Sequence, residues 1–360
     1  MERLWVMFLI VGLISGCSSH KRGAVEAVPP WFFEPADLRN KGGVGFSNPA
    51  IKEEKAYLIA KERAMKSLCN ITDEDCTEEI KELKQGKDVY LRGRKVKFLT
   101  KKIVDDRFVS KEIYAAYAGF KKPLSFKYYK DCLSPDLSKC KPEWVCDYFA
   151  EGVAGAVGIS NIAPNFFDEY ITALKDGVEK LSLMYGVDIS GFEIRKTFKE
   201  PLSTFKLKVR EIHLGKVKSR SIRIVVRSLF VDRNGKLFMY LISPDLKTNR
   251  PDMFKNKKLK PCWIDDPFCL GGEYVYVGVC GNHIGGVKEQ VNTAIKRALF
   301  QLAKDEGLLV DYERISVKID KNKWILKVLK EGVKQEVKGR VIGIYFSPSG
   351  KVFAGVVKAD

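Results

Sequence analysis

Hydrophobic residues recur in the same pattern three times along this chain. Apolar runs flank a turn that ends in Gly-Lys at 229–242 and at 344–357, and a degenerate version stands at 104–119. This arrangement is typical of β-hairpins. Further alternating stretches, such as 192–199 and 315–329, precede the last two hairpins. We therefore expect three or so antiparallel strands in each region.

A helical pattern precedes each group of strands. Counted from Asn48, Asn161 and Asn282, small or apolar residues stand at positions +12, +16 and +20. Steps of four keep these positions on one face of a helix, where small side chains let the helix axis come close to what lies beneath it. The residues are Ala60, Ala64, Leu68, Ala173, Gly177, Leu181, Ala294, Ala298 and Leu302.

The ends of these helices carry their own signals. We expect Asn48 to cap the first helix, with Pro49 at its first helical position. Gly186 and Gly307 should end the second and third helices. The first helix should end near Asn70, beside two cysteines that could clamp its exit.

Each helix follows a short phrase that begins Val-Gly, and each phrase follows a Pro-x-Trp. The glycine is expected where the chain leaves a strand, at a kink or a close contact that excludes a side chain. A phosphate loop is the alternative, but no Gly-x-Gly-x-x-Gly or Gly-Lys-Ser/Thr follows a strand here. The tryptophan is expected at the edge of a core with its indole N–H paired, the alternative being stacking on a sugar or lipid. The signature residues are Trp31, Gly45, Asn48, Trp144, Gly158, Asn161, Trp263, Gly278 and Asn282.

These patterns predict an α+β fold of three tandem modules. In each module one long helix would cover a small antiparallel sheet, in the order β-α-β-β-β. The modules are expected at 29–120, 141–243 and 260–360. The linkers, roughly 120–141 and 244–260, are rich in Lys, Pro and Asp and lack an apolar period.

The N-terminus has the features of a secretion signal. Arg3 precedes an apolar run from Leu4 to Ile14, which is too short to cross a bilayer as a helix but has the length of a signal-peptide core. The run ends in "LISGC", which resembles a bacterial lipobox, and predicts cleavage before Cys17 and acylation of that cysteine. An ordinary signal peptide with a chance cysteine is the alternative.

The predicted signal peptide covers 1–16 and a short polar tether covers 17–28. Several acyl chains, such as palmitate, would anchor the protein firmly, since each buried CH₂ contributes about 0.8 kcal/mol. Ser18 stands where an aspartate would signal retention in the inner membrane, so it favours the outer membrane. We expect a lipid-anchored protein that faces the periplasm.

The net charge is +18, from 63 Lys and Arg against 45 Asp and Glu. Many of the basic residues alternate with apolar ones, which is typical of solvated strand faces. Attraction to anionic lipid headgroups or envelope polymers is the alternative. A nucleic-acid partner is not expected, because the N-terminus directs the chain out of the cytoplasm.

The cysteines agree with an oxidising compartment. Eight follow Cys17, and three close pairs predict short disulfide loops, 69/76, 132/140 and 262/269, which leaves 146 and 280 to pair by elimination. Reduced, buried thiols are the alternative. A zinc site is not expected, because there is no Cys-x-x-Cys and the histidines are only His20, His213 and His283. The cysteines concerned are Cys69, Cys76, Cys132, Cys140, Cys146, Cys262, Cys269 and Cys280.

No catalytic residues, metal site or cofactor are predicted. Three histidines, one of them in the tether, offer little for a Ser-His or Cys-His arrangement. Asp265 and Asp266 lie within a short cysteine loop, and Asp105 and Asp106 at a turn. Either pair could bind a cation or do acid–base work, but solvated turn chemistry is the expected role.

The lipobox cysteine, the Pro-x-Trp, the glycine-rich strand and the alanine-spaced helix together resemble the Lpp-twenty-like outer-membrane lipoprotein family, including its flagellum-associated members. The first copy matches best, through "PPWFF" (29–33), "GGVGFSN" (42–48) and Ala56, Ala60 and Ala64. The resemblance covers about 29–119, and the later copies are divergent. It implies a lipid-anchored, non-enzymatic structural or assembly partner of a surface apparatus. Three copies in tandem depart from the single domain usual in the family.

The leading hypothesis is an outer-membrane adaptor that binds another envelope component or an anionic envelope polymer. The alternative is a carrier or sensor that binds a small anionic ligand or glycan between modules, with Lys206, Lys208 and Arg210 lining a groove. An envelope enzyme would need convergent polar groups, and the sequence offers no candidate set.

Overall fold

The structure is a computed structural model, which describes residues 28–50, 52–72, 74–108, 111–123, 126–199, 204–218, 223–247, 260–307, 309–319 and 322–359. Within these residues the chain is a mixed α+β protein with several small antiparallel sheets, as the hydrophobic pattern predicts. The predicted signal peptide and the lipidation residue Cys17 lie outside the described residues, as does the tether except for Val28.

Three three-stranded sheets share one strand order. In each, the first strand of the region lies at one edge, the last strand in the centre and the penultimate strand at the other edge, and all neighbours are antiparallel. We call each of these sheets, together with the helix and the connecting segments of its part of the chain, a unit. The strands are β1 (Gly42–Ser47), β5 (Glu112–Gly119) and β4 (Lys97–Val104) in the first unit, β6 (Val153–Ile159), β10 (Leu237–Lys247) and β9 (Val225–Val231) in the second, and β11 (Tyr276–Cys280), β15 (Val352–Lys358) and β14 (Gly339–Phe346) in the third.

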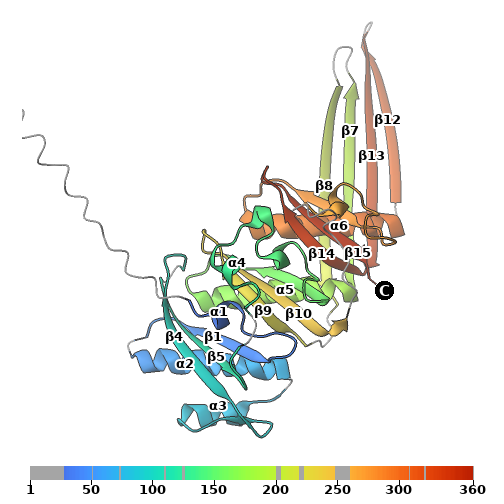
Figure 1. Ribbon diagram of the computed structural model, residues 1–360. Helices are drawn as coiled ribbons and strands as arrows, with labels where there is room; N and C mark the ends of the chain where they lie inside the picture. Colours follow the sequence, from blue (N-terminus) through green and yellow to red (C-terminus); the bar gives the residue numbers. More distant parts are fainter. Residues whose placement is uncertain are drawn as a thin grey trace, which may run out of the picture.

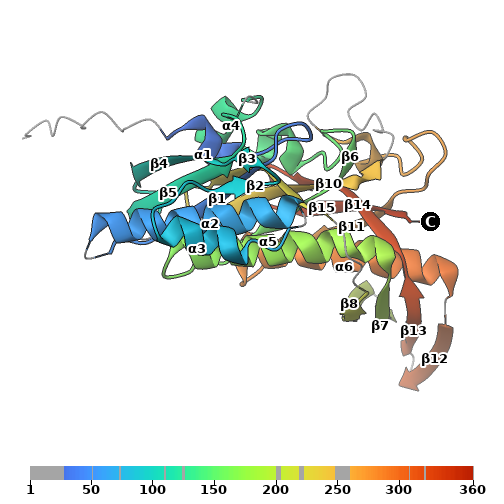
Figure 2. The ribbon, with the colours of Figure 1, turned by 90° about the horizontal axis from the view of Figure 1, so that it is seen from below.

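The three long helices lie in a row on one side of the sheets (Figure 2). They are α2 (Glu53–Thr72), α5 (Phe166–Ser182) and α6 (Gly286–Glu306). Every residue that the pattern placed at positions +12, +16 and +20 is buried. The hairpins β4–β5, β9–β10 and β14–β15 also form where the apolar runs predict them.

A fourth sheet joins the second and third units. Its order is β12-β13-β7-β8, so one long hairpin from each unit contributes two strands. The central strands pair from Val187↔Val337 to Lys199↔Ile325. This sheet, which we call the blade, projects away from the rest of the molecule (Figure 1). Its strands are β7 (Val187–Lys199), β8 (Thr204–Val217), β12 (Leu309–Ile319) and β13 (Asn322–Val337).

Short elements fill the connections. The segment expected as a linker at 120–141 contains α4, which lies against β9 and has Tyr128 and Cys132 buried at helical spacing. The second expected linker lies partly outside the described residues, and β10 extends to Lys247. The short elements are α1 (Pro30–Phe33), α3 (Thr77–Lys84), β2 (Tyr90–Leu91), β3 (Arg94–Lys95), α4 (Tyr129–Leu133) and the 3₁₀ turns η2 (Leu137–Lys139), η3 (Glu143–Val145), η4 (Leu183–Tyr185) and η6 (Cys262–Ile264).

The glycine of each Val-Gly phrase touches the backbone of its helix. A Cβ atom added at Gly278 would lie 1.9 Å from the carbonyl oxygen of Ala294 and 2.5 Å from the amide nitrogen of Ala298. Gly45 meets Ala60 and Ala64 in the same way, and Gly158 meets Ala173 and Gly177. The two small residues on the helix and the glycine on the strand therefore form one backbone-to-backbone contact in each unit.

The helix ends differ in part from the expectation. Asn48 is not a helix cap, because α2 begins at Glu53, after the chain has passed from the sheet layer to the helix layer. In α5 the cap is Asn165, whose side chain accepts a hydrogen bond from the Asp168 amide. Gly186, with φ at +120°, follows the 3₁₀ turn at the end of α5, and Gly307 follows α6.

Replacing Gly278 by alanine should destabilise the protein by about 2 kcal/mol or more, because the new methyl group would collide with helix backbone that cannot move independently. Gly281→Ala is the matched control, since nothing lies within 4 Å of a Cβ at that position. Urea unfolding of the mature chain, followed by circular dichroism, measures both changes. Equal stabilities for the two variants would contradict the close contact.

Candidate functional site

The three signature tryptophans lie in the core. Trp144 and Trp263 are fully buried and Trp31 is nearly so. The Trp144 ring stacks on Tyr240 at 5.5 Å between centroids, and Trp31 packs on Tyr117 at 6.2 Å. Their burial favours the core interpretation over stacking on a sugar. The indole N–H groups of Trp144 and Trp263 have no hydrogen-bond partner among the described residues, contrary to the pairing expected for buried tryptophans.

A buried ion pair joins the first and second units. The Arg227 guanidinium, on β9, donates to the carboxylate of Glu34 at 2.8 Å, and both side chains are almost fully buried. The backbone amide of Tyr128 donates to the second oxygen of Glu34, and Glu151 lies 3.5 Å from Arg227. Burial raises the pKa of Glu34, while Arg227 partly opposes the shift. Nothing in the local sequence around Glu34 indicates a partner 193 residues away.

Aromatic rings fill the rest of this joint. Phe166, at the start of α5, packs edge-to-face on Phe46 of β1 at 4.8 Å and on Phe108 at 5.0 Å, and stacks on Phe32 at 5.8 Å. Such pairs contribute beyond their buried area. The first two units therefore share one continuous core.

The second and third units meet through backbone and side-chain contacts. The amide of Tyr148 donates to the carbonyl of Ile342 on β14 at 3.1 Å. The Arg340 guanidinium lies over the ring of Phe149 at 5.4 Å. Asn292 of α6 donates to Asp176 of α5 at 3.2 Å. These contacts, together with the shared blade, fix the third unit against the second.

A polar helix residue binds the edge strand in each unit. Arg63 of α2 donates to the carbonyl of Phe46, and Arg297 of α6 donates to the carbonyl of Val279. In the second unit Asp176 occupies the same position and accepts from the amide of Ile159 at 2.8 Å. All three lie 15 residues after the signature asparagine of their unit. This regular spacing could have been found in the sequence, but a search for periodic apolar residues misses it because the residues are polar. Each satisfies a backbone group at a sheet edge.

The aspartate in the second unit is balanced by a lysine. Lys180 lies 2.6 Å from Asp176 and donates to the carbonyl of Val157 at 2.9 Å. Burial lowers the pKa of Lys180, and Asp176 opposes that shift. Both side chains are almost fully buried and hydrogen-bonded, so this pair has a structural role.

A cavity of about 780 Å³ lies between α5, β8 and α6. Its size is within the range of small-molecule sites. Four lysines at its wall have no ion pair among the described residues. The carboxylates of Asp176, Glu179 and Glu289 also line the cavity, together with apolar side chains. Arg210 is paired with Glu193 at 2.7 Å and is not among the lining residues. The side chains of Lys206 and Lys208, which were expected beside it, lie outside the described part of the structure. The four lysines are Lys175, Lys216, Lys288 and Lys296.

A second groove, of about 390 Å³, follows the joint between the first two units. Residues of β1 and β9 form its floor, and α2 and α5 form its walls. Its lining is mainly apolar, with Arg63 and Lys66 at the side. The two joints therefore differ in chemistry: the first is mainly apolar, while the second is charged, with more lysines than carboxylates.

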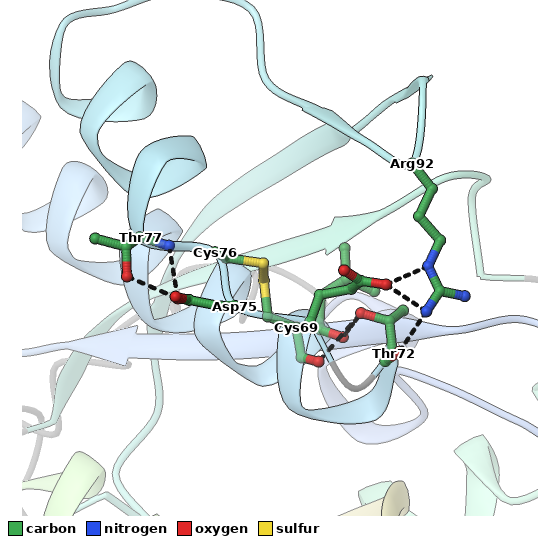
Figure 3. The surroundings of a disulfide bond; sticks show 8 residues. Cys69, Thr72, Asp75, Cys76, Thr77 and Arg92 are labelled. Atoms are coloured by element: carbon green, nitrogen blue, oxygen red, sulfur yellow. Dashed lines mark hydrogen bonds and ion pairs between the residues drawn. A yellow bond between two sulfur atoms is a disulfide. The ribbon is translucent and has the colours of Figure 1, made fainter.

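Three disulfides close short loops, as the spacing of the cysteines indicates, but not all pairs are as expected. Cys69 pairs with Cys76 at the exit of α2 (Figure 3), and Cys262 pairs with Cys269. The Asp75 carboxylate between the first two cysteines accepts from Thr77 and stabilises this turn (Figure 3).

The expected pairs Cys132–Cys140 and Cys146–Cys280 are wrong. Cys140 bonds to Cys146, because η2 and η3 fold back on each other and bring these two residues to a Cα distance of 5.4 Å. Cys132 is a buried thiol on α4, 3.3 Å from the Ser228 hydroxyl, and burial raises its pKa. Cys280 is a second buried thiol at the end of β11.

The paired carboxylates are turn residues. Asp105 accepts from the backbone amide and side chain of Arg107, and Asp266 accepts from the Phe268 amide at 3.0 Å. Asp265 is exposed and pairs with Lys260. Within the described part of the chain, no three His, Cys, Asp or Glu side chains are grouped closely enough to hold a metal ion.

Comparison of this chain with protein-family models, with curated proteins and with solved structures finds no match. Among the described residues, no helix has both the length and the apolar character needed to span a membrane.

Removing the carboxylate of Glu34 should destabilise the protein by about 3–5 kcal/mol, because Glu34→Ala leaves the Arg227 guanidinium buried opposite a cavity. Thermal and urea unfolding measure the change. The double variant Glu34→Met/Arg227→Met should recover most of the loss. The control is Asp245→Ala, which breaks the exposed pair with Arg223 and should cost less than about 1 kcal/mol. Equal losses from Glu34→Ala and Asp245→Ala would show that the buried pair does not couple the units.

Proposed function

We propose that this protein is a lipid-anchored lipoprotein of the bacterial outer membrane, which faces the periplasm and acts as a non-enzymatic structural or assembly adaptor. The lipobox that ends at Cys17 supports the anchor. Three short-range disulfides agree with an oxidising compartment. A surface apparatus such as the flagellum is a candidate partner, through the resemblance to the Lpp-twenty-like family.

The three units are, in this proposal, divergent copies of one module at 29–120, 141–243 and 260–360. Each has the same strand order, the same glycine-to-helix contact and a polar helix residue at the same offset. The buried ion pair and the aromatic cluster join the first two copies, and the blade and the contacts of β14 join the third to the second. A rigid body with several faces suits an adaptor, which must hold its partners at fixed positions.

The observation that carries the proposal is the blade. Its outer strands, β8 and β12, each pair with one neighbour among the described residues, so each presents an open edge. An open strand edge binds an extended segment of a partner through main-chain hydrogen bonds. By contrast, β1, β6 and β11 have a helix side chain bonded to their edge. The blade is therefore the part of the described fold best suited to strand addition.

The anchor is tested by Cys17→Ala. Native chain should incorporate radiolabelled palmitate and sediment with outer membranes, whereas Cys17→Ala should do neither, because the acylated residue is missing. Cys280→Ala, which removes a buried thiol, is the control and should retain both properties. Label on the Cys17→Ala chain, or native chain in the soluble fraction, would overturn the anchor.

The adaptor role is tested by a pair of proline substitutions on β8, Glu211→Pro and Ile212→Pro. Successive N–H groups of a strand point to opposite sides, so one substitution removes a bond to β7 and the other affects only the outer edge. The outer-edge variant should keep the native melting temperature and lose about tenfold in capture of envelope proteins by the mature chain. Unchanged capture by that variant would exclude strand addition at β8.

A second candidate is a carrier for a small anionic ligand, favoured by the lysine-lined cavity between α5, β8 and α6. A thermal-shift comparison with pyrophosphate, citrate and glucuronate discriminates between the two functions. Specific stabilisation that Lys288→Ala and Lys296→Ala abolish would favour the carrier.

A further inference from the structure

The same turn is built after Trp144 and after Trp263. In the second unit the Asp147 side chain accepts from the Phe149 amide at 2.9 Å, and the Gly152 amide donates to the Phe149 carbonyl at 2.8 Å. The third unit repeats this turn with the same donors and acceptors, at 3.0 Å and 3.3 Å. The two closing glycines have φ of +74° and +77°. The equivalent residues of the third unit are Asp266, Phe268 and Gly271.

The phenylalanine of this turn has opposite surroundings in the two units. Phe149 is 1% exposed, because β14 of the next unit covers it and places Arg340 over its ring. Phe268 is 66% exposed and packs on Tyr274, which is itself 42% exposed. Contiguous exposed apolar surface, in contrast to single scattered side chains, is a feature of interaction sites. We call Asp266, Phe268 and Tyr274 the terminal face.

At both joints inside the chain, the edge strand that crosses to the neighbouring unit is bulged. At the second joint the pairing of β14 with β15 skips Ile342, whose carbonyl accepts from Tyr148. At the first joint the pairing of β9 with β10 skips Arg227, which reaches Glu34. Each of these strands also carries an arginine that contacts the neighbouring unit: Arg340 lies over the ring of Phe149, and Arg227 donates to the carboxylate of Glu34. The edge strand at each joint is therefore irregular and carries arginine, and at the second joint it covers a turn of this kind.

A second copy of this chain cannot supply that strand. Its β9 and β14 are already used, and the corresponding strand of the first unit is β4. The β4 strand pairs with β5 without any skipped residue. It also carries Lys97, Lys101 and Lys102, and lysines along an edge oppose strand-to-strand association. The first unit therefore closes the row of sheets at one end, while the terminal face leaves the other end open.

We propose that the terminal face binds a bulged, arginine-bearing edge strand from a different polypeptide, one that has a helix-on-sheet unit of the same kind. The incoming arginine lies over Phe268, as Arg340 lies over Phe149, and within reach of Asp266. A cation over an aromatic ring, next to a carboxylate, gives both orientation and affinity. This inference rests on the proposed adaptor function and names one of the partners that the adaptor holds.

The experiment places the photo-crosslinking amino acid p-benzoylphenylalanine at position 268 of the full-length, anchored chain. Irradiation of intact envelopes should yield one major adduct with another protein. Mass spectrometry should map the adduct to an edge strand, within about two residues of an arginine. Position 126 is the matched control, because Phe126 is also an exposed phenylalanine, at 50%, and it should give about tenfold less adduct.

Substitutions then separate this inference from the adaptor function as a whole. With the crosslinker at position 274 instead, Phe268→Asp should lower the adduct about tenfold, whereas Phe126→Asp should leave it within about twofold. Adducts only with a second copy of this chain, only with lipid, or no more than at position 126 would overturn the inference. If no adduct forms at the terminal face while capture through β8 is unchanged, this inference is wrong and the adaptor function is still supported.

Discussion

The close approach of a strand and a helix, backbone to backbone, is the constraint on which the rest of the structure depends. Gly45, Gly158 and Gly278 have no side chain to hold the helix away, and the helix offers small residues at the same level. The contact fixes both the distance of the helix from the sheet and the side of the helix that faces the sheet. Because one face of the helix is committed in this way, its other faces are free to vary.

That freedom explains why the two joints differ although the units are alike. The α2 and α5 helices enclose a groove lined mainly by apolar residues, whereas α5 and α6 enclose a cavity rich in lysine. The polar residue that holds the edge strand also changes, from arginine to aspartate and back. The aspartate is tolerated because Lys180 lies beside it in the same buried site. The glycine contact is thus the same in the three units, while the surfaces between the units differ.

The sequence predicts the local structure well and the long-range structure poorly. Periods of two and four residues predict the hairpins and the buried faces of the helices, since both depend on neighbours close in the chain. The ion pair between Glu34 and Arg227 spans 193 positions, and no period reports it. The partner of Cys140 depends on how two 3₁₀ turns fold back, which spacing alone does not determine. The Asp-x-Phe that follows Trp144 and Trp263 can be found in the sequence as a short motif. Only the structure shows that the phenylalanine is buried in one copy and exposed in the other.

The pairing of β7 with β13 has a consequence for biogenesis. The two strands are more than a hundred residues apart, and both lie in the centre of the blade. A chain synthesised from its N-terminus completes the β7–β8 hairpin first, with no partner for the inner side of β7. Until β13 is made, that side of β7 is an unpaired strand edge, which is prone to pair with other chains.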